Sequence, residues 1–215
     1  MIPIPEVGFK YYALRYLNLW ISQDEPFCHA LAGHSREKKL EALARAAAKY
    51  GIARTLPKRD GTDKGLERYG PVLNIIDRQK REDFRRDEIP QRIKSVSRQI
   101  KRQYGADHQV LSLTTKFLWL KMKSPIIIYD SRARNALKVT KIDDFYPLWR
   151  KEFSRFEKDI RHACSSLRAM HEYTEKVTNP QYIAKITAKR WFRERVFDVY
   201  LWHLGEPERP VARSN

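Results

Sequence analysis

Cysteine is scarce in this sequence, which has only two, Cys28 and Cys164, among its 215 residues. Two thiols are too few for an iron–sulfur cluster or a four-cysteine zinc site. They could pair with each other, but so small a number in a chain of this size favours reduced thiols in a cytosolic protein. The 6 histidines show no HExxH or His-x-His spacing, so they indicate no metal site. We therefore predict a protein that uses no metal ion or other cofactor.

Long apolar runs and strand patterns are also missing. No run reaches the length of about eighteen apolar residues that a membrane-spanning helix needs. The first residues, MIPIPEVGFKYY, lack a charged segment ahead of an apolar one, so we do not expect a secretory signal. Only IIIYD, residues 126–130, has the composition of an extended segment, and it has no obvious partner strand. The sequence therefore predicts an all-α protein with no membrane partner.

Acidic residues are few relative to basic ones. Asp and Glu number 26 against 43 Lys and Arg, which gives a formal net charge of +17 and a pI near 9.9. Such an excess favours a polyanionic partner, most often nucleic acid, over an anionic membrane surface or simple solubility. Aromatic residues make up 12% of the chain and include 5 Trp, which suits a folded nucleic-acid-binding protein better than a disordered basic tail.

Helical periodicity, by contrast, extends over most of the chain. We expect helices over residues 9–21, 36–51, 71–85, 90–105, 112–122, 131–139, 144–172 and 180–204. Glycines and a proline among charges predict a mobile loop over about 52–70, and the tail 206–215 is expected to fray. Together these features predict a compact helical bundle that forms a single domain over residues 1–215.

One of these helices carries a stripe of positive charge. Its cations lie opposite an apolar stripe of isoleucine and valine, and no acidic residue is interleaved among them. The alternative is a solvated charged face, but an uncompensated stripe favours a surface that faces phosphate groups. The predicted DNA-binding residues of the stripe are Lys94, Arg98, Lys101 and Arg102.

A lysine and an aspartate flank the most apolar segment of the chain. Lys116 lies at the edge of the apolar face of the helix expected over 112–122. The run 126–128 must be largely buried, and it leads to Asp130 at the start of the next helix. From periodicity alone, Lys116 is interpreted as a surface lysine with a buried stem, and Asp130 as a helix N-cap.

This region resembles the helix–hairpin–helix DNA glycosylases, in the branch similar to 8-oxoguanine DNA glycosylase. VLSLTTK, residues 110–116, is similar to the family's hairpin with its nucleophilic lysine, and IYDSR, residues 128–132, is similar to the segment with its catalytic aspartate. Compact bacterial proteins of this type carry similar TK, IYDSR and NAL pieces. The resemblance implies that Lys116 is the nucleophile, Asp130 the catalytic carboxylate and Arg132 a phosphate contact.

The resemblance also implies a degenerate hairpin, because Ser112 and Thr114 stand where the family has glycines. Together with Thr115 they are expected to contact DNA. In this chemistry the carboxylate stabilises an oxocarbenium-like sugar, and a neutral amine attacks C1′ to form a Schiff base. Burial against apolar neighbours favours the neutral form of an amine.

The implied partner is double-stranded DNA with a damaged or modified base flipped out of the stack. Aromatic candidates for the base pocket or wedge are Trp119, Tyr129, Trp149 and Trp191, although aromatics at helical spacing more often belong to a core. We expect a monomer in the bacterial cytoplasm, associated with the nucleoid when bound to DNA. Two alternatives stay open: a defence protein that excises hypermodified phage bases by the same chemistry, and a non-catalytic basic nucleic-acid-binding module.

Overall fold

The computed structural model describes residues 2–56, 65–105, 110–176 and 179–206, and all regular structure within these ranges is helical. The prediction of an all-α fold is confirmed. The helices are α1 (Gly8–Leu19), α2 (Glu25–Ala32), α3 (Arg36–Lys49), α4 (Gly70–Asp77), α5 (Ile89–Tyr104), α6 (Leu111–Met122), α7 (Ser131–Leu137), α8 (Ile142–Ser166), α9 (Pro180–Thr187) and α10 (Arg190–Leu204). Among the described residues, no helix is long and apolar enough to cross a membrane.

Several expected helix boundaries shift in the structure. Helix α3 begins after Ser35, whose hydroxyl accepts a hydrogen bond from the Lys38 amide, as expected of an N-cap. Helix α4 ends at Asp77 instead of near residue 85, because the Lys80 amide donates to Asp83 and opens a separate 3-10 turn. Helix α2 was not expected from the sequence. A short π-helix, Trp20–Asp24, joins it to α1.

The region expected to be a mobile loop, 52–70, contains two 3-10 turns, Ala53–Thr55 and Gly65–Tyr69. Residues 57–64 of that loop lie outside the described residues, as do residues 207–215 of the tail. Both cysteines are free, and both are buried.

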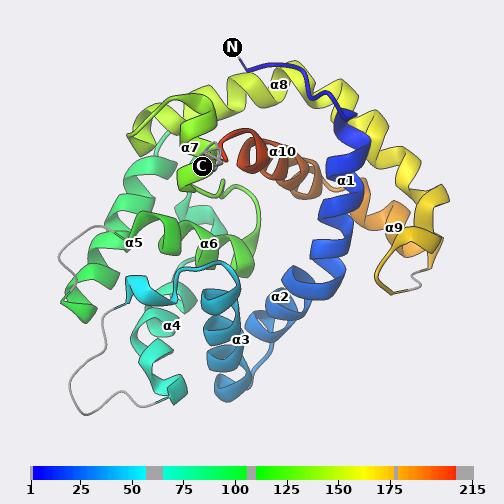
Figure 1. The fold of residues 1–215 in the computed structure, drawn as a ribbon. Coiled ribbons are helices and arrows are strands. Elements are labelled where there is room, and N and C mark those ends of the chain that lie inside the picture. The colour runs from blue at the N-terminus through cyan, green and yellow to red at the C-terminus, as the bar shows by residue number, and fades with distance from the viewer. Residues whose placement is uncertain (1, 57–64, 106–109, 177–178, 207–215) are drawn as a thin grey trace, which may run out of the picture.

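Helix α10 lies in the middle of the molecule, enclosed by α1, α7 and α8 (Figure 1). The N-terminal helix α1 packs on α8 and α10 from the C-terminal part of the chain. Helix α6 contacts α2, α4 and α5 on the other side. The segment between α6 and α7 therefore connects two groups of helices, and it is the segment that carries Asp130.

This connecting segment, residues 126–129, is buried, as predicted, and has no regular secondary structure, while Asp130 after it has extended backbone angles. Side chains replace the missing partner strand. The Tyr146 hydroxyl donates to the Ile127 carbonyl oxygen at 2.8 Å and accepts from the Ile127 amide at 3.0 Å. The Tyr129 amide donates to Thr115 Oγ1 at 3.0 Å. Unsatisfied backbone groups are costly inside a protein, so these contacts fix the segment beside α6.

A glycine holds the end of α10 against the start of α7. An added Cβ at Gly205 would lie 1.8 Å from the Arg132 carbonyl oxygen, so no other residue fits there without movement of the backbone. This contact brings the last turn of α10 next to Asp130, which immediately precedes α7.

Candidate active site

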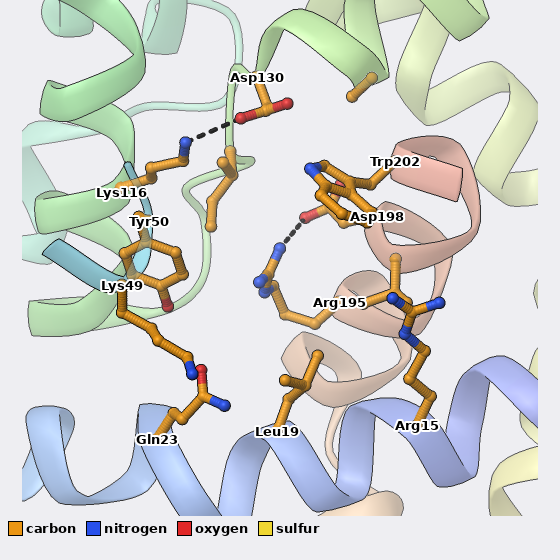
Figure 2. Close-up of a pocket in the computed structure, with 13 residues that line it drawn as sticks. Arg15, Leu19, Gln23, Lys49, Tyr50, Lys116, Asp130, Arg195, Asp198 and Trp202 are labelled. Carbon is orange, nitrogen blue, oxygen red and sulfur yellow. Dashed lines mark hydrogen bonds and ion pairs between the residues drawn. The ribbon is translucent and has the colours of Figure 1, made fainter. Parts of the chain in front are cut away.

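The structure brings Lys116 of α6 and Asp130 of the connecting segment into direct contact. Lys116 Nζ donates to Asp130 Oδ2 at 2.8 Å (Figure 2). Asp130 Oδ1 accepts from the Arg132 amide at 3.0 Å, so the aspartate is also the N-cap of α7. The side chains are 8% and 16% exposed. Lys116 is therefore a buried partner of Asp130, and its interpretation as a surface lysine was wrong.

The ion pair lines a cavity of about 270 Å³. Helix α1 and the π-helix contribute Arg15, Leu19 and Gln23 to its wall, and the end of α3 contributes Lys49 and Tyr50. In Figure 2, Arg195, Asp198 and Trp202 of α10 lie across the cavity from Lys116. Four segments that are far apart in the sequence therefore supply the wall.

A second charged cluster forms the wall opposite Lys116. Arg195 Nη1 donates to Asp198 Oδ2 at 3.1 Å, and Trp149 Nε1 donates to Asp198 Oδ1 at 2.7 Å. Arg195 Nη2 lies 3.9 Å from Asp24 Oδ2. The Tyr50 hydroxyl donates to the other oxygen of Asp24. The cluster is thus a connected network of charges and hydrogen bonds.

Burial sets the protonation behaviour of this cluster. It raises the pKa of Asp198 to about 6 and also raises the pKa of Asp24, while the Arg195 guanidinium opposes both shifts. For Arg195 itself, burial acts to lower the pKa, but Tyr16 and the two carboxyl groups around it raise the pKa overall. Arg195 therefore stays charged. Its Nε is buried and has no hydrogen-bond partner among the described residues.

Aromatic rings pack around both charged groups. Lys116 Nζ lies 5.7 Å from the centroid of the Tyr50 ring. The guanidinium of Arg195 lies 4.9 Å from the Trp119 ring centroid. These cation–π contacts help to hold both cations in place at the cavity wall.

The predicted hairpin residues lie in a helix. Helix α6 begins at Leu111, so Ser112 and Thr114 belong to its first turn, and residues 106–109 before it lie outside the described residues. Thr114 and Thr115 are fully buried, and their hydroxyls donate to the carbonyls of Val110 and Ser112. The expectation that these two threonines contact DNA is therefore wrong for this structure, because neither reaches the surface. Ser112 is partly exposed.

The predicted aromatic candidates lie largely in the core. Trp119 and Trp149 are each 1% exposed, and the hydroxyl of the buried Tyr129 donates to the Thr140 carbonyl oxygen. Trp191 is partly exposed and packs on Trp20, with ring centroids 4.5 Å apart. As wedges, Trp119, Tyr129 and Trp149 are excluded by their burial in this conformation.

Sequence reasoning missed the exposed aromatic residue at this cavity. Trp202 lines the cavity and is 37% exposed. The Arg132 guanidinium lies 3.7 Å from its ring centroid and pairs with Glu206 at 3.2 Å. The only signal in the sequence is a tryptophan on the last turn of an aromatic-rich helix. Arg195 and Asp198 were missed because nothing local distinguishes them from surface charges.

The basic stripe on α5 is less uniform than its sequence suggests. Lys94 Nζ pairs with both oxygens of Asp143 on α8 at 2.9 Å. The description of the stripe as uncompensated is therefore wrong for Lys94, because its partner comes from another helix. Arg98 and Arg102 are exposed, and Lys101 is partly exposed.

No group of three or more His, Cys, Asp or Glu side chains within the described ranges is arranged to hold a metal ion. No protein-family model, no curated protein and no solved structure matches this chain. Its function must therefore be inferred from the geometry of the cavity.

Proposed function

We propose that this protein is a DNA glycosylase that breaks the N-glycosidic bond of a damaged or modified base. The observation that supports the proposal most directly is the buried Lys116–Asp130 contact of 2.8 Å at the wall of a cavity. It pairs an amine with a carboxylate, which is the combination that the family resemblance implies for this chemistry. The net charge of +17 is consistent with a DNA partner.

In the proposed reaction, the ammonium of Lys116 first gives a proton to Asp130, the acceptor that it already contacts. The neutral amine then attacks C1′ of the flipped nucleotide. A C–N bond forms between Lys116 and the sugar, and the bond to the base breaks with its electron pair leaving on the base. The base takes up the proton held by Asp130 as it departs, which returns Asp130 to its carboxylate form.

Positive charge develops on the sugar as the base leaves, and a nearby carboxylate stabilises it. Once the sugar ring opens, the covalent adduct is a Schiff base. Loss of a proton from C2′ then breaks the C3′–O bond and nicks the strand. This β-elimination is the lyase step of the proposal.

The remaining groups of the cavity fit a flipped base. Trp202 is partly exposed at the wall, and a base can stack on the part of its ring that the Arg132 guanidinium does not cover. Arg132, beside Trp202, is the proposed contact to a phosphate group.

The first test is covalent trapping. With borohydride and duplexes that carry a panel of damaged or modified bases, the protein should form a covalent complex with DNA. Lys116→Gln keeps length and polarity but has no nucleophilic amine, so it should give no complex. Lys49→Gln is the matched control, because Lys49 lines the same cavity from α3 and should trap like the wild type. Trapping that survives in Lys116→Gln would remove Lys116 from its proposed role.

The second test is Asp130→Asn, scored as abasic sites formed. Asparagine can still accept the N-cap hydrogen bond but carries no charge. Excision should fall by about 10²–10³-fold while DNA affinity stays close to that of the wild type. Normal excision by this variant would mean that Asp130 is only a cap. If Asp130→Asn does not fold, Asp130→Ser, which also caps helices, replaces it.

One observation favours the non-catalytic nucleic-acid-binding module. Both oxygens of Asp130 and the Lys116 amine already have protein partners, as in a structural ion pair. That candidate predicts tight, salt-sensitive DNA binding with neither excision nor trapping on any base in the panel.

The same panel separates repair from defence. If the protein excises only hypermodified phage bases and no damaged base, the defence role is favoured over repair.

A further inference from the structure

A second cavity, of about 680 Å³, lies on the other side of the connecting segment 126–129. Ile128 lines the Lys116 cavity, whereas its neighbour Ile127 lines the second one. The rest of its wall comes from residues 81–89, the end of α6, the middle of α8 and the start of α10.

The wall of this second cavity carries an excess of positive charge. Its cationic residues are Arg81, Arg86, Lys123, Arg150, Lys189 and Arg190. The only carboxylate among its described lining residues is Glu194, which pairs with Arg190 at 2.9 Å. Glu194 also accepts a hydrogen bond from Ser124 at 3.0 Å. Within the described part of the chain, the other cations of the wall form no ion pair with a carboxylate.

Two of these cations are held in place without a carboxylate partner. Arg150 is partly buried and donates to the backbone carbonyl of Arg86 at 3.2 Å. Burial, and then the charge of Arg86, lower the pKa of Arg150, while Tyr146, Asp87 and Glu194 act in the opposite direction. Lys123 Nζ lies 5.4 Å and 5.5 Å from the ring centroids of Trp20 and Trp191.

The backbone of Lys123 is unusual as well. Its φ is +58° and its ψ is −115°, outside the regions that side-chain-bearing residues normally adopt. Such conformations persist only where the surrounding structure holds them, and they concentrate at functional sites. Here the conformation turns the chain at the end of α6, beside the two tryptophans.

We infer that this second cavity binds a phosphate ester, on a nucleic-acid strand or on a free nucleotide. Guanidinium groups match phosphate oxygens geometrically, and a bound phosphate would relieve the repulsion between Arg86 and Arg150. The partly exposed ring of Trp191 offers a face on which a base can stack. The volume is in the range of small-ligand sites. This site is separate from the proposed reaction at Lys116 and does not depend on it.

The test compares two double variants that each remove two positive charges. Arg86→Gln with Lys189→Gln changes two exposed cations of the cavity. Lys158→Gln with Arg161→Gln changes two exposed cations of α8 that line neither cavity. Binding of a short single-stranded oligonucleotide is measured by anisotropy at several salt concentrations, with tryptophan fluorescence as a second readout.

The cavity variant should bind more weakly than the α8 variant. Its plot of log K against log salt concentration should be flatter by about 0.7 for each phosphate group that it no longer binds. Binding to the wild type should also change tryptophan emission, because Trp149 and Trp191 line the cavity. Equal affinities and slopes for the two variants would overturn the inference.

Further ligands identify the source of the phosphate. Displacement of the oligonucleotide by a mononucleotide indicates a nucleotide site, and displacement only by a second oligonucleotide indicates a strand. Polyglutamate, an anion without phosphate, should bind weakly and equally to both variants. If polyglutamate binding is weakened in the cavity variant to the same extent, the site is not specific for phosphate and the inference fails. Arg81→Gln replaces the cavity variant if that variant does not fold.

Discussion

The Lys116 cavity and the second cavity lie on opposite sides of the same connecting segment, and α10 contributes to both walls. In the first, the buried cations have carboxylate partners: Lys116 contacts Asp130, and Arg195 contacts Asp198. In the second, Arg190 alone among the lining cations pairs with a carboxylate of the described residues. Oppositely charged buried groups hold each other in fixed positions without a ligand. Neighbouring cations that lack a carboxylate partner repel each other, and a bound anion reduces this repulsion.

This difference in pairing predicts unequal effects on stability when one cation is removed from each cavity. Lys116→Met leaves the buried carboxylate of Asp130 without its partner, so the free energy of unfolding should fall by about 3 kcal/mol. Arg86→Gln removes a repelling charge, so its effect should stay within about 0.5 kcal/mol. Denaturant unfolding of both variants measures the difference.

Lys116→Met combined with Asp130→Asn is the control for this prediction. It removes the unpaired charge and should recover part of the stability. Equal decreases in Lys116→Met and Arg86→Gln would mean that pairing does not distinguish the two cavities.

The exposed aromatic ring in the Lys116 cavity, Trp202, can be tested by mutation. If a flipped base stacks on Trp202, Trp202→Ala should weaken binding of such DNA by about 1–3 kcal/mol. Trp202→Phe keeps an aromatic face and should retain most of the affinity. The measurement is anisotropy with a duplex whose target base is already unpaired. Unchanged affinity in Trp202→Ala would place the base elsewhere.

A pH dependence should arise from the paired cavity. The folded-state pKa of Asp198 is about 6, above the ordinary value of 3.8 for this side chain, so the folded protein holds this proton more tightly than the unfolded chain does. The resulting stability is fully present below about pH 4 and is lost as pH rises through 6. Asp24, whose pKa is also raised by burial, acts in the same direction. The decrease is limited to about 1.4 kcal/mol per pH unit for one group.

Thermal unfolding between pH 4 and pH 6 measures this effect. In Asp198→Asn the corresponding decrease in stability should disappear, because no carboxyl titrates at this position. An identical pH profile in wild type and variant would assign the titration to other groups.

The smallest expected effect concerns the α5 stripe. Arg98 is exposed, so Arg98→Gln should reduce the slope of log K against log salt by about 0.9 for duplex DNA if it contacts one phosphate. Lys94→Gln should reduce the slope less, because Asp143 already neutralises Lys94. Equal effects would mean that DNA displaces Asp143. No effect from either would make the stripe a solvated face.

The sequence by itself determined most of the helices, although not α2, and several of their ends. Apolar spacing predicts which residues form one helical face, and Ser35 and Asp130 cap their helices through local hydrogen bonds. The buried run 126–128 could be recognised from its composition. Lys116 and Asp130 could be identified as candidate residues from the sequence. Their separation of 14 residues along the chain, however, does not predict that their side chains are in contact.

Only the tertiary structure decided what surrounds them. Periodicity shows which face of a helix is buried but not which helices meet, so it could not bring Tyr50, Arg195 and Trp202 to one cavity. It likewise gave no sign that Asp143 pairs with Lys94, or that cations from four segments line a second cavity. Contacts between distant segments depend on how the helices pack, and neither local propensity nor the charge of a single helix encodes that packing.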